Sequence, residues 1–110
     1  MAAPQPARIS WEDLALTAGE RLRARRHELK LTMRDVYLTT VQIAKKEGDN
    51  EEFIVRPSRL SDVEIKGQVP NIYRLYSLAV VYDISLLELL SWYGIHCELM
   101  PKVAAHATGR

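Results

Sequence analysis

Signals that start helices recur along this chain, and their spacing constrains the fold more than any other feature of the sequence. Ser10, Thr32 and Ser85 each stand three residues before an acidic residue, an arrangement in which a hydroxyl caps the free amides of a helix start. Pro57 and Pro70 fit first turns of helices, where the missing N–H of proline loses no hydrogen bond. No alternating strand pattern extends beyond a few residues, and no segment repeats. The chain is therefore predicted to fold as an all-α protein.

Apolar residues follow each of these signals at three- and four-residue steps. This periodicity predicts helices from residue 10 to about 29, 32 to about 47, 57 to about 67, 70 to about 82 and 85 to about 94. The positions expected to face inward are Leu14, Ala18, Leu22, Leu29, Val36, Thr40, Val41, Ile43, Ala44, Val55, Leu60, Val63, Ile72, Leu75, Leu78, Ala79 and Tyr82. Residues 48–52 combine turn residues with three acids and hold no apolar side chain, so they are expected to form an exposed, mobile loop.

The length of 110 residues suits one domain and excludes an enzyme with separate cofactor and substrate domains. Hydrophobic residues make up 47% of the chain and charged residues 26%, a balance typical of folded proteins rather than disordered ones. The folded domain is expected at residues 10–96. Residues 1–9, which lack periodicity, are expected to be a flexible arm, and residues 97–110 a loose tail.

Several classes of protein and site are disfavoured. No apolar run reaches the roughly 18 residues that span a bilayer, and no secretory signal precedes the first helix, so a cytoplasmic protein without membrane contact is expected. The single Cys97 excludes an internal disulfide framework. His96 is adjacent to Cys97, and His27 and His106 are remote, a spacing that disfavours a metal site. No phosphate-binding loop or nucleophile motif is present, so neither enzymatic activity nor a cofactor is expected.

Charge is unevenly distributed along the chain, although the formal net charge is only +1. Residues 1–34 hold seven basic and four acidic residues, residues 35–52 two and five, and residues 53–74 four and two. Two basic segments that flank an acidic one can form a nucleic-acid footprint. The more ordinary explanation for Arg21, Arg23, Arg25 and Arg26 is that they only solvate the first helix.

The order of a long helix, a capped helix, a short basic helix, and two more apolar helices resembles that of the Cro/repressor-like (XRE-type) helix-turn-helix regulators. The resemblance covers about residues 17–95. It is carried by Gly19–Arg26 with Leu31 and Thr32, by Val36, Val55, Leu60–Glu64, Val69 and Pro70, and by Tyr73–Ala79 and Asp83–Leu90. It implies a compact five-helix bundle of the lambda-repressor-like type, with residues 10–96 as the DNA-binding domain. The chain departs from the family at Lys30, Met33 and Gly67, and in the long second helix or loop between Thr32 and Val55.

The resemblance implies a sequence-specific regulator of transcription that binds double-stranded DNA through a recognition helix at about residues 56–66. It implies that Arg56 and Arg59 contact guanine or phosphate, that Ser58 and Ser61 contact base edges or phosphate, and that Asp62 accepts from cytosine. The residues implied to contact the DNA backbone are Lys66, Gln68, Asn71 and Arg74. The full set of implied DNA-binding residues is Arg56, Pro57, Ser58, Arg59, Ser61, Asp62, Lys66, Gln68, Asn71 and Arg74.

Two further questions stay open from the sequence. The near-neutral charge, the acidic 48–52 segment and Asp62 favour an alternative, a protein-interaction module (antitoxin-like or a scaffold) that keeps the fold without strong DNA binding. A homodimer through the C-terminal helix is also predicted, because one helix face cannot bury all of Leu86, Leu87, Leu89, Leu90, Trp92 and Tyr93. The alternative is that this helix is buried on several sides within the monomer.

Overall fold

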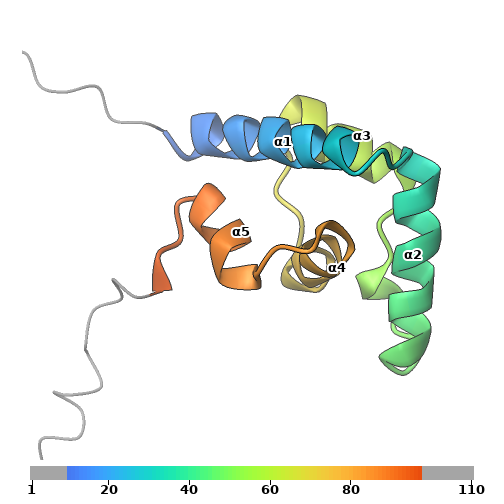
Figure 1. Ribbon diagram of the computed structural model, residues 1–110. Coiled ribbons are helices and arrows are strands. Elements are labelled where there is room, and N and C mark those ends of the chain that lie inside the picture. The colour runs from blue at the N-terminus through green and yellow to red at the C-terminus, as the bar shows by residue number, and fades with distance from the viewer. Residues whose placement is uncertain (1–9, 98–110) are drawn as a thin grey trace, which may run out of the picture.

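The computed structural model describes residues 10–97, which form five α-helices and one short 3₁₀ helix, with no strand in that range (Figure 1). The α-helices are α1 (Trp11–Glu28), α2 (Met33–Lys46), α3 (Pro57–Lys66), α4 (Ile72–Tyr82) and α5 (Leu86–Trp92), and the 3₁₀ helix is η1 (Glu51–Phe53). The prediction of an all-α fold is confirmed. The predicted arm at residues 1–9 lies outside the described residues, as does nearly all of the predicted tail.

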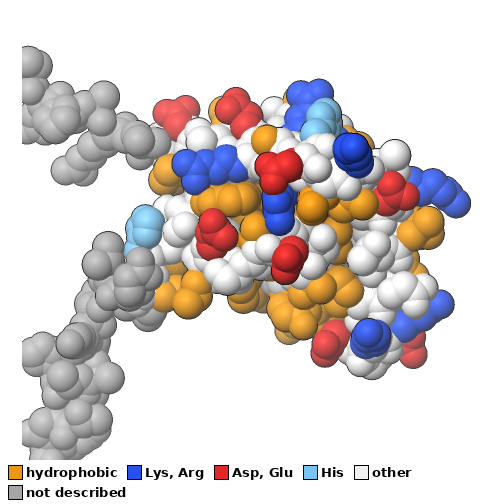
Figure 2. Space-filling model, in the orientation of Figure 1, with side chains coloured by type: hydrophobic (Ala, Val, Ile, Leu, Met, Phe, Trp, Pro, Cys, Tyr) orange, Lys and Arg blue, Asp and Glu red, His pale blue; other side chains and the backbone are white. Residues whose placement is uncertain are grey.

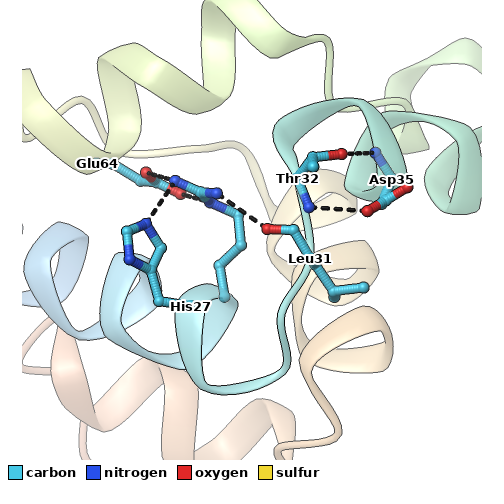
Figure 3. A network of polar contacts seen from close by, with 6 residues as sticks. His27, Leu31, Thr32, Asp35 and Glu64 are labelled. Atoms are coloured by element: carbon cyan, nitrogen blue, oxygen red, sulfur yellow. Dashed lines mark hydrogen bonds and ion pairs between the residues drawn. The ribbon is translucent and has the colours of Figure 1, made fainter.

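Side-chain caps start four of the α-helices. Ser10 accepts a hydrogen bond from the Asp13 amide, and Ser85 accepts one from the Glu88 amide, as predicted. Thr32 and Asp35 form a complete capping box, with each side chain accepting from the other residue's N–H (Figure 3). The hydrogen bond that the Thr32 backbone N–H donates stabilises the Asp35 carboxylate and lowers its pKa. The fourth cap is Asn71, so the expectation that Pro70 lies in the first turn is wrong: α4 begins at Ile72.

The helices enclose one apolar core. α1 packs most extensively against α3, which lies beside it, and α2 leaves the end of α1 at a steep angle (Figure 1). α5 contacts both α1 and α4. The buried cluster consists of Leu22, Val36, Val55, Leu60, Val63, Leu75, Leu78, Ala79, Tyr82 and Leu89. Each of the five α-helices contributes at least one residue to this cluster. The remaining member, Val55, comes from the segment just before α3.

Two of the predicted inward positions face solvent instead. Leu29 caps the C-terminus of α1 and is exposed, because the chain leaves the helix there and turns through Lys30, whose φ is 58°. Ile72 lies in the first turn of α4 and is 52% exposed. It lines a surface groove and not the core, which α4 reaches through Leu75, Leu78, Ala79 and Tyr82.

The C-terminal helix α5 places most of its apolar side chains against the protein's own core. Leu89 is fully buried, and Leu86, Leu90, Trp92 and Tyr93 pack against the core as partly buried residues. Leu87 points outward and is 60% exposed. Most of the apolar side chains of α5 are covered within the domain because α5 packs on two helices, α1 and α4. The sequence argument for a dimer through α5 therefore loses most of its force, although the dimer itself stays a prediction.

Two buried phenols predict that the protein loses stability at alkaline pH. Burial raises the pKa of Tyr93 from 10.0 to about 12, and burial, followed by the nearby Glu64 carboxylate, raises the pKa of Tyr82. Above about pH 10 the unfolded chain releases these protons while the folded chain keeps them, so the unfolding free energy falls as pH rises. The expected slope is about 1.4 kcal/mol per pH unit for each tyrosine.

Urea unfolding at a series of pH values between about 9 and 12 measures this slope. Tyr93→Phe removes one of the two titrating groups, so its unfolding free energy should fall less steeply than that of the wild type. Equal slopes for the two proteins would show that Tyr93 is as accessible to ionisation when folded as when unfolded.

Candidate nucleic-acid interface

Helix α3 has one buried face and one open face. Leu60, Val63 and Glu64 are buried against the domain. The open face and the helix start carry the predicted recognition residues: Arg56, Pro57, Ser58, Arg59 and Lys66 are exposed, and Ser61 and Asp62 are partly exposed. The structure thus brings these seven predicted residues together on one exposed side of one helix. Ile65, which is exposed among them, is the apolar member of this surface.

The start of α3 is open to solvent and basic. Pro57 occupies the first turn, as predicted, and Arg56 at the cap position makes no side-chain hydrogen bond to the helix. The remaining N–H groups of the first turn therefore receive no side-chain acceptor from Arg56, and the partial positive charge of the helix start favours an anion. The Arg56 guanidinium lies over the Tyr37 ring of α2, 5.9 Å from the ring centroid, so the two helices place a cation beside this helix start.

One salt bridge lies within the open face. Asp62 Oδ1 lies 3.4 Å from Lys66 Nζ, and both side chains are substantially exposed. The face therefore holds three cations (Arg56, Arg59 and Lys66) and one carboxylate (Asp62), an excess of two positive charges. A polyanion meets a favourable local charge here even though the whole chain is close to neutral.

A buried ion pair fixes the inner face of α3 to α1. Arg26 Nε and Nη2 donate to the two carboxylate oxygens of Glu64 at 2.8 and 2.9 Å, a bidentate arrangement. Arg26 Nη1 also donates to the Leu31 carbonyl at 3.0 Å, and the His27 ring lies against the same guanidinium (Figure 3). The Glu64 side chain is completely buried, and its hydrogen bonds raise the pKa of the Arg26 guanidinium. The orientation of α3 is thereby set by two charged groups that have left water.

Sequence reasoning missed this pair. The expectation that Arg26 only solvates α1 is wrong, because only 8% of the residue is exposed. The periodicity held a usable signal: Glu64 follows Leu60 by four residues and Arg26 follows Leu22 by four, so both charged residues continue apolar stripes. A basic and an acidic residue on the inward faces of two helices can be buried only as partners.

A glycine at position 19 lets the backbones of α1 and α3 approach closely. A Cβ atom added at Gly19 would lie 2.3 Å from the Val63 carbonyl oxygen and 3.1 Å from that of Glu64. No side chain larger than hydrogen fits between the two helices at this point. Gly19 and the Arg26–Glu64 pair therefore hold Val63 and Glu64 of α3 against two places along α1.

The last three predicted DNA-binding residues lie after α3. Gln68 is exposed, and its backbone N–H closes the end of α3 by donating to the Asp62 carbonyl. Asn71 caps α4 and donates to Glu52 Oε2 at 2.8 Å. Arg74 donates to the Ile54 carbonyl at 3.0 Å and lies 3.7 Å from Glu52. Asn71 and Arg74 thus already have intramolecular partners that join η1 to α4.

The same contacts bear on the expectation that residues 48–52 form a loop that only projects into solvent. This expectation is wrong at Glu52, because the Glu52 carboxylate accepts a hydrogen bond from Asn71 and pairs with Arg74. Asn50 caps η1 by accepting from the Glu52 amide. Phe53, just beyond the acidic stretch, provides the apolar contact that the stretch lacks, since its ring packs edge-on against Tyr73 and Tyr76.

Neither a metal site nor a single membrane-spanning helix among the described residues competes with the open face of α3 as a candidate site. Between residues 10 and 97, no three His, Cys, Asp or Glu side chains come together as metal ligands would. No helix in that range is by itself long and apolar enough to cross a membrane; α4 and α5 pass that test only as a pair, and the chain bends by 113° between them. Comparison of the chain with family models, curated proteins and solved structures finds no match.

Proposed function

We propose that this protein is a sequence-specific regulator of transcription that binds double-stranded DNA by inserting the open face of α3 into the major groove. One observation carries the proposal: a ten-residue helix is fixed to its domain by a buried ion pair, while its other side offers small polar and basic side chains to solvent. A major groove about 12 Å wide admits one helix. Rigid attachment matters because base recognition requires side chains held in register with base edges.

The elements around α3 suit a helix-turn-helix unit with an enlarged connection. In this proposal α2 is the bracing helix, and its 14 residues exceed the ten of α3. The connection from α2 to α3 folds back onto the domain: η1 contacts α2 and α4, and the Val55 amide donates to the buried Thr40 hydroxyl at 3.0 Å. Arg74 offsets the charge of Glu52 at the edge of this connection.

The roles follow from position on the helix. Arg59 is the proposed base-reading residue, because its guanidinium can bind guanine O6 and N7 together. Arg56, beside the open helix start, is proposed to bind phosphate, and Ser58 and Ser61 base edges or phosphate. Lys66 is proposed to contact the backbone, with Asp62 either keeping Lys66 in place or accepting from cytosine.

Arg59→Ala is expected to weaken binding to a duplex selected from a random library by about 5- to 150-fold and to relax the preference at one base pair. Fluorescence anisotropy on selected and scrambled duplexes measures both effects. Lys45→Ala is the matched control, because it removes the same charge from an exposed position in the last turn of α2. An equal loss on both duplexes would make Arg59 a phosphate contact.

Salt dependence tests the proposal as a whole. Each phosphate contact made by Arg56 or Lys66 should contribute about 0.9 to the slope of log affinity against log salt, so removing either should reduce that slope. A wild-type affinity that does not change between low and physiological salt would contradict DNA binding through this surface.

A protein-interaction module of the antitoxin or scaffold type is the second candidate. The observation that favours it is the carboxylate of Asp62 within the open face, together with a formal net charge of only +1. Absence of duplex binding at low salt, with the helical circular dichroism spectrum intact, would favour this function over the first.

A further inference from the structure

A groove beside α4 is lined almost entirely by aromatic and aliphatic side chains. Ile72, Tyr73 and Tyr76 of α4 line it together with Phe53 of η1 and Leu86 of α5, and its volume is about 390 Å³. Figure 2 shows hydrophobic side chains gathered over the region that α4 occupies in Figure 1. A groove of this size and lining suits a small ligand. None of its lining residues belongs to α3, so the groove is separate from the proposed DNA-binding face.

Three rings in the groove form an aromatic cluster of Phe53, Tyr73 and Tyr76. The Phe53 ring stands at 73° to the Tyr73 ring and at 75° to the Tyr76 ring, with centroid distances of 5.3 and 5.8 Å. Tyr73 and Tyr76 are 45 and 39% exposed, so the cluster is open to solvent. The face of an aromatic ring carries partial negative charge and attracts a cation that lies within about 6 Å of its centre. Several rings set at steep angles around one groove suit an alkylated ammonium group, which contacts more than one ring at once.

The groove also contains one formal charge, and that charge is negative. Glu47 is exposed and is the one charged residue that lines the groove. Between residues 10 and 97, no hydrogen bond or ion pair engages its carboxylate. Lys45 and Lys46 precede it in the sequence but do not line the groove. A carboxylate beside the faces of aromatic rings favours a positively charged ligand and disfavours an anion.

Among the described residues, no cation of the chain itself lies over the aromatic cluster. Two other rings of the domain each have an arginine: Arg21 lies 5.7 Å from the centroid of Trp92, and Arg56 lies 5.9 Å from that of Tyr37. Arg74, the one charged residue in the α4 sequence, donates instead to the backbone between η1 and α3. A second groove, between α1 and α5, contains Trp92 together with its arginine. The aromatic cluster is therefore the place where a cation from outside the chain fits.

We propose that this groove binds a small organic cation, a quaternary ammonium compound of the choline type. The ammonium group lies against the aromatic cluster, and Glu47 supplies the opposite charge. Methyl groups on the nitrogen suit the site because they spread the charge over an apolar surface, whereas a compact primary ammonium is strongly hydrated and loses more on leaving water. The inference does not rest on DNA binding, because no residue of α3 takes part in the site.

An NMR titration of the isotope-labelled full chain with choline tests the site. Choline is expected to shift the amide signals of the residues that line the groove, with a Kd in the millimolar range, as suits so small a ligand. The control ligand is the neutral isostere of choline, in which a tert-butyl group replaces the trimethylammonium group. Since it has the same shape without the charge, it is expected to bind at least about 5-fold more weakly.

Variants at two positions separate the ring from the charge. Tyr73→Leu removes one ring but keeps an apolar side chain and should raise the Kd for choline by about 2- to 30-fold, whereas Tyr73→Phe keeps the ring and should stay within about 2-fold of the wild type. Glu47→Gln should weaken the binding of choline and leave that of the neutral isostere unchanged. Glu51→Gln is the matched control, because it neutralises an exposed carboxylate outside the groove.

Four results would overturn the inference: no shift of the groove signals at tens of millimolar choline, equal affinity for choline and its isostere, shifts confined to the groove of Trp92, or unchanged choline binding by Tyr73→Leu. The comparison of the two ligands uses the wild type, so it decides the question even if a variant fails to fold. Groove signals that move with protein concentration in the absence of choline would assign the surface to a second copy of the chain instead. A chain that binds choline but no duplex would refute the proposed function and leave this site standing.

Discussion

Arg26→Met is expected to lower the free energy of unfolding by about 3–5 kcal/mol, the largest effect of any substitution considered for this chain. The substitution leaves the Glu64 carboxylate completely buried without the guanidinium that donates to both of its oxygens. The free-energy cost of leaving the Glu64 charge unpaired inside the protein far exceeds the free energy that the same ion pair contributes when exposed to water. Urea denaturation followed by circular dichroism measures the loss.

Two controls separate this effect from a general loss of charge or of packing. Arg23→Met removes a cation from an exposed position on the same helix and should change the unfolding free energy by less than about 0.5 kcal/mol. The double variant Arg26→Met with Glu64→Met should be more stable than Arg26→Met, because no charge is left buried. Additive losses in the double variant would show that the two residues act independently and that the pair does not fix α3.

Gly19→Ala is expected to destabilise the protein by about 1–3 kcal/mol, although alanine is the better helix former. The added methyl group would lie 2.3 Å from the Val63 carbonyl oxygen, so α1 and α3 must move apart. Because α3 carries the proposed DNA-reading residues, affinity for a selected duplex should fall more than Lys45→Ala makes it fall. Thermal denaturation and anisotropy measure the two effects.

Position 24 supplies the control for helix propensity. Ala24 is exposed on the same helix, and Ala24→Gly should cost about 1 kcal/mol because glycine loses more backbone entropy. A loss at Gly19→Ala, where propensity alone predicts a gain, therefore reports the close approach of the two backbones. Unchanged or increased stability of Gly19→Ala would mean that α1 and α3 separate without cost.

Local signals predicted much of the fold. The Thr32–Asp35 capping box, Pro57 in the first turn of α3 and the end of α3 at Gly67 were all expected, because each depends on residues a few positions apart. The open face of α3 was predicted in the same way, since the positions of Leu60 and Val63 fix the inner face. Whether that face binds DNA stays a prediction.

Contacts between distant segments were not predicted from the sequence. The Arg26–Glu64 pair joins residues 38 positions apart, and the Glu52–Asn71 hydrogen bond joins residues 19 apart. The exposure of Ile72 and the burial of much of α5 likewise depend on which elements pack against α4 and α5. Periodicity gives the apolar side of a helix, but it does not give the number of neighbours that cover it.

The separation of 38 positions between Arg26 and Glu64 also has a consequence for synthesis of the chain. At translation rates of about 5–20 residues per second, Glu64 is added roughly 2–8 seconds after Arg26. Until Glu64 is added the nascent chain lacks the end of α3 and all of α4 and α5, and α3, α4 and α5 together supply most of the buried cluster. The domain therefore cannot fold stepwise from its N-terminus, and its core forms only after most of the chain has left the ribosome.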